Sequence, residues 1–91
     1  MAQKKSKSAQ VDKTFTKARN HFAAGDFTTA EELLKQIISQ DAAYAGAYCY
    51  LGRIAHATGH SAHAVPLFQE SVRLEPTNVE YIKLLARQLE T

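Results

Sequence analysis

The chain has 91 residues, enough for one small domain, and 45% of them are hydrophobic. Its single cysteine, Cys49, excludes an internal disulfide and a cysteine-based metal site, and no apolar run is long enough to span a membrane. The net charge is +2, but residues 1–10 carry three lysines and no acid, whereas the remainder has eight basic and nine acidic residues. We therefore expect a cytoplasmic protein whose body is nearly neutral, which disfavours nucleic acid as a partner.

The first residues differ in character from the rest of the chain. Residues 1–10 are polar and lysine-rich without periodicity, which predicts a disordered basic leader. Apolar residues then recur at steps of three and four, at Val11, Phe15, Ala18 and Phe22. This spacing predicts a helix, and Gly25 is expected to end it.

Four further helices are predicted from the same periodicity and from the turn residues between them. They span residues 28–39, 43–58, 61–74 and 79–90. Side chains that accept hydrogen bonds precede each helix, and we predict caps at Asp26, at Asp41, at Ser61 and at Thr77 or Asn78. Pro66 lacks an amide hydrogen, so it predicts a late start or a kink in the fourth helix.

Residue types recur at an offset of 34 along the chain. Gly25 is matched by Gly59 and Ala30 by Ala64, and the arginines Arg19, Arg53 and Arg87 form a series with the same offset. A period of 34 with two helices per unit is typical of helix–turn–helix solenoids. No single hairpin can bury its apolar face alone, so neighbouring hairpins must complete the core.

The second unit resembles the tetratricopeptide repeat. Its pattern residues are Tyr48, Leu51, Gly52, Ala55, Ala64, Phe68 and Pro76. The resemblance implies an all-α solenoid of five helices, with two repeats and a C-terminal capping helix. The expected parts are the leader (1–10), a degenerate first repeat (11–44), a second repeat (45–78), and a capping helix or half of a third repeat (79–91).

The resemblance also suggests a binding surface. In the family, the side of each first helix opposite the core stripe lines a concave groove, and it would carry Arg19, Arg53 and Arg87 in a column spaced by roughly 10 Å. Planar guanidinium groups suit carboxylates. Cys49 and His56 share the stripe of Arg53 and are included in the predicted surface. The alternative is three solvated arginines paired with nearby acids.

Aromatic and apolar side chains extend this hypothesis. Phe22 and Tyr50 are predicted to contact the apolar part of a ligand, although the helical spacing of Phe15 and Phe22 also suits a core position for one of them. In the last helix, Ile82, Leu85, Ala86 and Leu89 are expected to face inward. Tyr81 and Leu84 are expected to be poorly covered and are candidates for self-association.

Residue types that carry chemistry are present in patterns that do not predict catalysis. His56, His60 and His63 have a spacing that zinc can use, but Gly59 interrupts the helix between them. Cys49 and His56 lie about 10 Å apart along a helix, too far for a hydrogen bond. We therefore expect no catalytic residue, no metal and no cofactor.

These patterns together predict a non-catalytic interaction module that binds an acidic peptide segment of another protein in its groove. One alternative is a self-assembling, oligomeric scaffold. Another is the N-terminal region of a larger bacterial transferase, because the first repeat resembles the opening repeat of bacterial arrays that precede transferase domains. Nucleic-acid binding through the leader is the least favoured alternative, and no contact with a membrane is expected.

Overall fold

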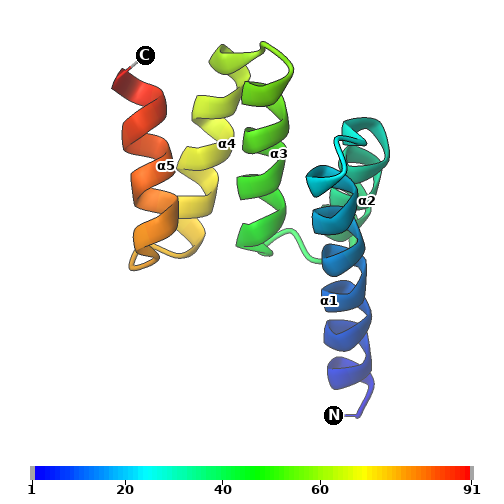
Figure 1. Ribbon diagram of the computed structural model, residues 1–91. Coiled ribbons are helices and arrows are strands. Elements are labelled where there is room, and N and C mark those ends of the chain that lie inside the picture. The colour runs from blue at the N-terminus through cyan, green and yellow to red at the C-terminus, as the bar shows by residue number, and fades with distance from the viewer. Residues whose placement is uncertain (1, 91) are drawn as a thin grey trace. The chain divides into compact units, whose positions relative to one another are not determined.

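The computed structural model describes residues 2–90, with side chains from residue 9 onward, and the regular structure in that part is entirely helical. Its five helices are α1 (Ala2–Ala23), α2 (Phe27–Gln40), α3 (Ala45–Ala57), α4 (Ser61–Leu74) and α5 (Val79–Glu90), as Figure 1 shows. The all-α prediction is confirmed. Contacts divide the chain into two compact units, Met1–Ala42 and Ala43–Thr91, which we call unit 1 and unit 2. Within the described residues, no helix is both long and apolar enough to cross a bilayer.

Unit 1 is a hairpin of α1 and α2 joined by a three-residue turn. Its buried apolar residues recur at helical spacing on both helices, at Val11, Ala18, Ala30, Leu34 and Ile37. The helix α1 begins at Ala2. Residues 2–10, which composition predicts to be a disordered leader, therefore continue the helix in the structure.

Glycine ends the first helix of each hairpin by the same hydrogen-bonded turn. Gly25 has φ of 83° and Gly59 has φ of 84°, a left-handed conformation that glycine adopts without steric cost. At the first turn, the amide of Asp26 donates to the carbonyl of His21 at 2.8 Å. At the second, the amide of His60 donates to the carbonyl of Ala55 at 2.7 Å. The two turns are 34 residues apart, so the sequence repeat is also a repeat in backbone geometry.

Unit 2 consists of α3, α4 and α5, and α4 packs against both of the others (Figure 1). The helices α3 and α4 pack closely at Gly52, where a Cβ atom would lie 2.6 Å from Cε1 of Phe68. The Phe68 ring is 2% exposed and the neighbouring Ala64 is fully buried. A small residue on α3 therefore lets a large ring of α4 fill the space between the helices.

The predicted caps are confirmed at two helix starts. The Asp26 carboxylate accepts a hydrogen bond from the amide of Thr29 at 3.3 Å and caps α2. The Asn78 side chain accepts from the amide of Tyr81 at 3.3 Å, at the start of α5. Both contacts satisfy amides that have no partner inside the helix.

Two other predicted caps are wrong. Asp41 ends α2, where its amide donates to the carbonyl of Ile37, while Tyr44 precedes α3 without a side-chain cap. Ser61 is the first residue of α4, and His60 stands at its cap position. The helix also runs through Pro66 from that start, so the late start predicted for it does not occur.

The predicted orientation of α5 is wrong as well. Ile82 is 43% exposed, Leu89 is 61% exposed, and Ala86 is exposed, although all three were expected to face inward. The buried residue of the helix is instead Gln88, and Leu85 is half-buried. The helix α4 covers one side of α5, and among the described residues no helix covers the stripe that contains Ile82 and Leu89.

Candidate functional site

Electrostatic interactions connect four side chains of α3 and α5 in unit 2. Cys49 and Arg53 lie one turn apart on α3, and Glu80 and Tyr81 open α5. The charges of Arg53 and Glu80 both act on the Cys49 thiol, and those of Cys49 and Arg53 act on the Tyr81 hydroxyl. We call this group, together with Arg87, the α3–α5 surface.

Arg53 is held in place by an aromatic side chain of its own helix. Its guanidinium carbon lies 4.9 Å from the centroid of the Tyr50 ring, within the range of a cation–π interaction. The Nε atom of Arg53 is buried and has no hydrogen-bond partner among the described residues. A buried N–H group without a partner is costly.

The thiol beside this arginine is in its neutral form. Cys49 is 1% exposed, and burial raises the pKa of its thiol, while the adjacent guanidinium of Arg53 acts in the opposite direction. A buried, protonated thiol is a poor nucleophile. Cys49 therefore lies buried beside Arg53 and is not accessible to a partner from solvent.

Tyr81 is the neutral hydrogen-bonding group of the α3–α5 surface. Burial raises the pKa of its hydroxyl to about 12, with smaller contributions from the nearby Cys49 and Glu75. The side chain is half-buried, and it stays protonated throughout the physiological range. A protonated phenol can donate a hydrogen bond to a carboxylate, which makes Tyr81 a second donor near Arg53.

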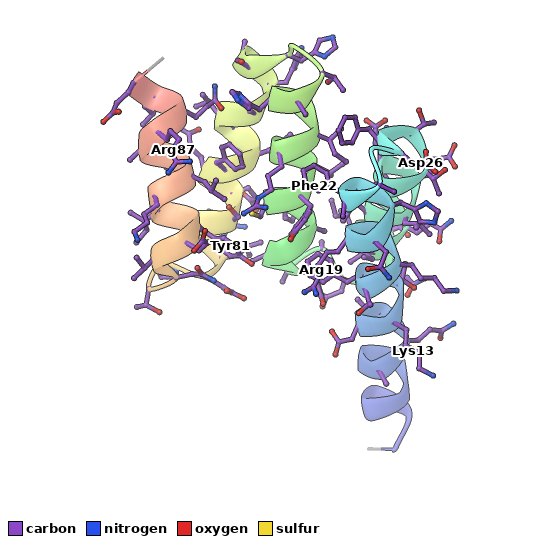
Figure 2. The ribbon with its side chains drawn as sticks, viewed as in Figure 1. Lys13, Arg19, Phe22, Asp26, Tyr81 and Arg87 are labelled. Atoms are coloured by element: carbon purple, nitrogen blue, oxygen red, sulfur yellow. The ribbon has the colours of Figure 1, made fainter. Side chains whose placement is uncertain are left out.

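Arg87 adds an exposed positive charge to the same side of α5. It lies seven residues after Glu80, which places the two residues on one face of the helix. Figure 2 shows Arg87 further along α5 than Tyr81. Ion pairs form between His21 and Asp26, between Glu31 and Lys35, and between Glu70 and Arg73. None of these three pairs uses Arg53 or Arg87.

Unit 1 repeats the arginine-on-aromatic arrangement on α1. The guanidinium carbon of Arg19 lies 5.6 Å from the centroid of the Phe15 ring. Phe22 is half-buried and its ring contacts that of Phe27, with centroids 5.4 Å apart. The core interpretation therefore describes Phe22 better than a free contact surface does. In both units the arginine at this repeat position lies over the ring of an aromatic residue that comes three or four positions earlier in the chain.

The remaining candidates are separated by the structure. His56 is exposed on α3, whereas Cys49 of the same predicted stripe is buried. The hydroxyl of Thr58 lies 3.0 Å from Nδ1 of His60, and the rings of His60 and His63 have centroids 6.1 Å apart. Among the described residues, no group of three or more potential ligands is arranged to hold a metal ion.

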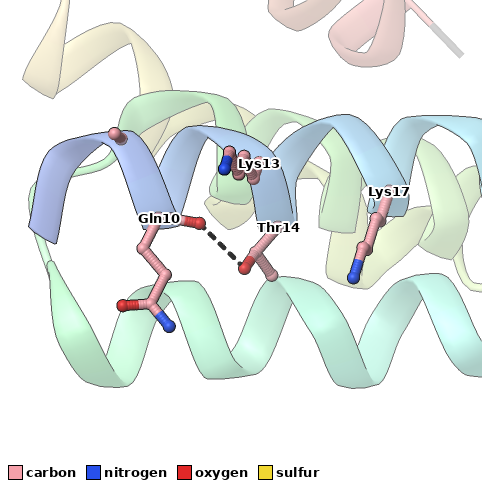
Figure 3. Close-up of a pocket in the computed structure, with 5 residues that line it drawn as sticks. Gln10, Lys13, Thr14 and Lys17 are labelled. Atoms are coloured by element: carbon pink, nitrogen blue, oxygen red, sulfur yellow. Dashed lines mark hydrogen bonds between the residues drawn. The ribbon is translucent and has the colours of Figure 1, made fainter. Parts of the chain in front are cut away.

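The helix α1 carries a basic hollow. It is lined by Ala9, Gln10, Lys13, Thr14 and Lys17, shown in Figure 3. The Thr14 hydroxyl donates to the carbonyl of Gln10 at 3.0 Å. The hollow is open, and its two lysines are one helical turn apart on an exposed face. Such a face attracts anions weakly and without shape selection.

Sequence reasoning missed part of the α3–α5 surface. The sequence predicts Tyr81 as a self-association residue, whereas in the structure Tyr81 and Glu80 both interact electrostatically with Cys49 of α3. Neither residue has a match of its own kind at the 34-residue offset, because Gly46 and Ala47 occupy those positions. The electrostatic interaction between α3 and α5 identifies these two residues as part of the surface. A sequence pattern does not show which residues of two helices interact.

The fold defines a class of protein: helical hairpins that repeat at an offset of 34, each closed by the same glycine turn. The tetratricopeptide repeat family matches residues 21–89, and the chain belongs to that family. The comparison with curated protein sequences gave no match. Tetratricopeptide repeats are protein–protein interaction modules and are typically non-catalytic.

Proposed function

We propose that this chain binds an acidic peptide segment of another protein, and that Arg53 is the anchor of the interaction. The observation that supports this proposal is the Arg53 guanidinium, whose central carbon lies 4.9 Å from the centroid of the Tyr50 ring and which takes part in none of the ion pairs His21–Asp26, Glu31–Lys35 and Glu70–Arg73. A guanidinium already fixed over a ring loses little freedom when a carboxylate binds.

The other members of the α3–α5 surface have complementary roles in this proposal. Tyr81 donates a neutral hydrogen bond and Arg87 attracts a second acid of the segment. Glu80 would repel a peptide that places an acidic residue opposite it. The site would therefore select peptides by the positions of their acidic residues. Arg19 is included in the proposed binding surface because it lies 34 residues before Arg53 and because its guanidinium also packs on an aromatic ring, that of Phe15.

The proposal is tested with an Arg53→Glu variant as bait against the source lysate. A matched control is Lys35→Glu, which makes the same charge change at an exposed position on α2. Proteins held by the native chain and by Lys35→Glu, and lost with Arg53→Glu, are expected. Peptides tiled across each of these proteins should then bind in proportion to their acids, with binding lost when the acids are changed to amides. Equal capture by all three baits would overturn the proposal.

A further inference from the structure

The positive charge of the chain is concentrated on one helix. The sequence of α1 contains six basic residues and one acid, whereas the whole chain contains 11 basic and nine acidic residues. The rest of the chain therefore has five basic residues against eight acids, and the small net charge conceals a basic helix on an acidic body. Because residues 2–10 continue α1, the lysines of that segment stand on the same helix as Lys13 and Lys17.

The helix α1 extends beyond the helix that packs on it. It has 22 residues and α2 has 14, and a short turn joins them, so about 12 Å of α1 continues past the end of α2 (Figure 1). The helix α2 packs on the side of α1 that carries the buried Val11 and Ala18. Ala9, Thr16 and Asn20 lie on the opposite side and are exposed. One long side of α1 is therefore open to a partner.

Basic residues form a row on each flank of this open side. Around the helix axis, Lys13 lies about 40° and Lys17 about 80° from Ala9 in one direction. By their places along α1, Lys5 and Arg19 stand about 40° and 80° away in the other direction. The hollow in Figure 3 is therefore part of a longer basic surface. We define the α1 surface as Lys5, Ala9, Lys13, Thr16, Lys17, Arg19 and Asn20.

The arrangement of the two rows favours duplex DNA as the partner. The major groove of B-DNA is about 12 Å wide, which admits one α-helix. A helix that enters this groove has phosphates on both flanks and base edges in front of it. The α1 surface has basic residues on both flanks, and the small or uncharged Ala9, Thr16 and Asn20 between them allow a close approach.

Other anionic partners fit this surface less well. A helix that lies on a membrane inserts large apolar side chains, and among the described residues the exposed ones of this kind, Val79, Ile82 and Leu89, belong to α5. Single-stranded nucleic acid is bound by stacking on aromatic rings, whereas Phe15 and Phe22 of α1 are half-buried. Duplex RNA has a deep, narrow major groove that side chains do not reach.

We infer that the outer side of α1 binds duplex DNA in the major groove, mainly through the phosphates and without strong selection of base sequence. This differs from the expectation based on net charge, because the structure joins residues 2–10 to the basic part of α1. The interaction is separate from the proposed binding of an acidic peptide at Arg53, and Arg19 is the residue that the two surfaces share. Asp12 is exposed on the same flank as Arg19, where its charge opposes the phosphates.

The test is the fluorescence anisotropy of a labelled DNA duplex of about two helical turns, titrated with the full chain at several salt concentrations. We expect micromolar affinity that falls linearly on logarithmic scales as salt rises, because binding releases counterions. The double variant Lys13→Gln, Lys17→Gln should reduce the slope of that line by about two and weaken binding about tenfold. The matched control, Lys35→Gln with Lys83→Gln, makes the same charge change at exposed positions of α2 and α5 and should leave the slope nearly unchanged.

Two single variants of α1 test the position of the DNA. Ala9→Phe keeps the charge but places a large ring on the open side, so it should weaken binding about tenfold if the helix enters the groove. Circular dichroism should show unchanged helix content, because Ala9 is exposed. Asp12→Asn removes the opposing charge and should tighten binding several-fold.

The remaining comparisons separate this inference from its alternatives. Arg53→Gln should leave DNA binding nearly unchanged while it reduces the capture of acidic peptides, so that the two proposals can fail independently. Equal salt slopes for the Lys13, Lys17 variant and its control would overturn the inference, as would full affinity in Ala9→Phe. Tighter binding of single-stranded DNA, of duplex RNA or of anionic vesicles than of the DNA duplex would also overturn it.

Discussion

Gly52 on α3 and Phe68 on α4 occupy complementary positions in the core of unit 2. A Cβ atom on Gly52 would lie 2.6 Å from Cε1 and 2.8 Å from Cδ1 of the Phe68 ring. Carbon atoms in good contact are about 3.5–4.0 Å apart, so these two distances leave no room for a methyl group. The ring is 2% exposed and cannot turn outward without losing its burial.

We predict that Gly52→Ala destabilises the protein by about 1–3 kcal/mol, the usual cost of an extra methyl group in a packed core. Urea unfolding followed by circular dichroism measures this cost. The double variant Gly52→Ala, Phe68→Leu should be less destabilised than the sum of the two single changes, because the smaller side chain makes room for the methyl. Additive costs would show that the two residues do not compete for the same space.

Gly59 should respond to substitution by a different mechanism. Its φ of 84° is left-handed, and no atom lies within 4 Å of a Cβ placed there, so the cost of Gly59→Ala is in the backbone alone. We expect a loss of about 1–2 kcal/mol for alanine and less for Gly59→Asn, because asparagine tolerates this conformation. Thermal unfolding of the two variants compares these costs. Equal melting temperatures for alanine and asparagine would contradict the backbone explanation.

These glycines also show which parts of the fold are predictable. Gly25 and Gly59 end helices where the sequence indicates, because few residues adopt positive φ and the signal is local. The caps are less predictable. Asp41 and Ser61 are good capping residues, but Asp41 stands at the end of α2 and Ser61 is the first residue of α4. A cap depends on where the preceding turn places the backbone, and composition does not encode that position.

The faces of the helices show the same limit. Periodicity identifies two partly apolar sides on α5, one with Tyr81 and Leu84 and the other with Ile82 and Leu89. Which side is covered depends on the position of α4, and a single helix does not contain that information. On α3 the sequence predicts one stripe for Cys49, Arg53 and His56, but the structure buries Cys49, half-buries Arg53 and leaves His56 exposed.

The cap of α2 should make stability depend on acid pH. The pKa of the Asp26 carboxyl is held below its ordinary value of 3.8, chiefly by hydrogen bonds from Thr29 and to a smaller extent by His21, whose Nδ1 lies 3.0 Å from the carboxylate. A lowered pKa means that the unfolded chain takes up the proton first. The stabilisation is therefore complete above the ordinary value and is lost as the pH falls through the lower, folded-state value.

The measurement is a series of melting temperatures between pH about 5 and about 2, the range in which an aspartate titrates. In Asp26→Asn the amide still caps the helix but cannot titrate, so we expect a flatter acid limb than in the native chain. Glu70 also titrates with a lowered pKa because of Arg73, and Glu70→Gln serves as the matched variant on α4. An unchanged slope in Asp26→Asn would show that folding does not lower the pKa of the Asp26 carboxyl.

The Cys49 thiol should report the opening of unit 2. The side chain is 1% exposed and burial raises the pKa of the thiol, so a disulfide reagent such as Ellman's should react with it only after the structure opens. At neutral pH we expect a rate far below that of the unfolded chain. The rate should approach the unfolded value through the urea transition, because unfolding exposes the thiol. Cys49 is the only cysteine of the chain, so the reaction reports on this site alone.

The Gly52→Ala variant then distinguishes global opening from local fraying. If the thiol becomes accessible only when the α3–α4 packing is lost, each 1.4 kcal/mol by which Gly52→Ala destabilises the protein should raise the labelling rate about tenfold. A local opening that keeps Phe68 in place would instead leave the rate unchanged. We expect the first result, since Cys49 and Gly52 are three residues apart on the same helix and α3 cannot expose the thiol without separating from its neighbours. A variant that loses stability without faster labelling would contradict this expectation.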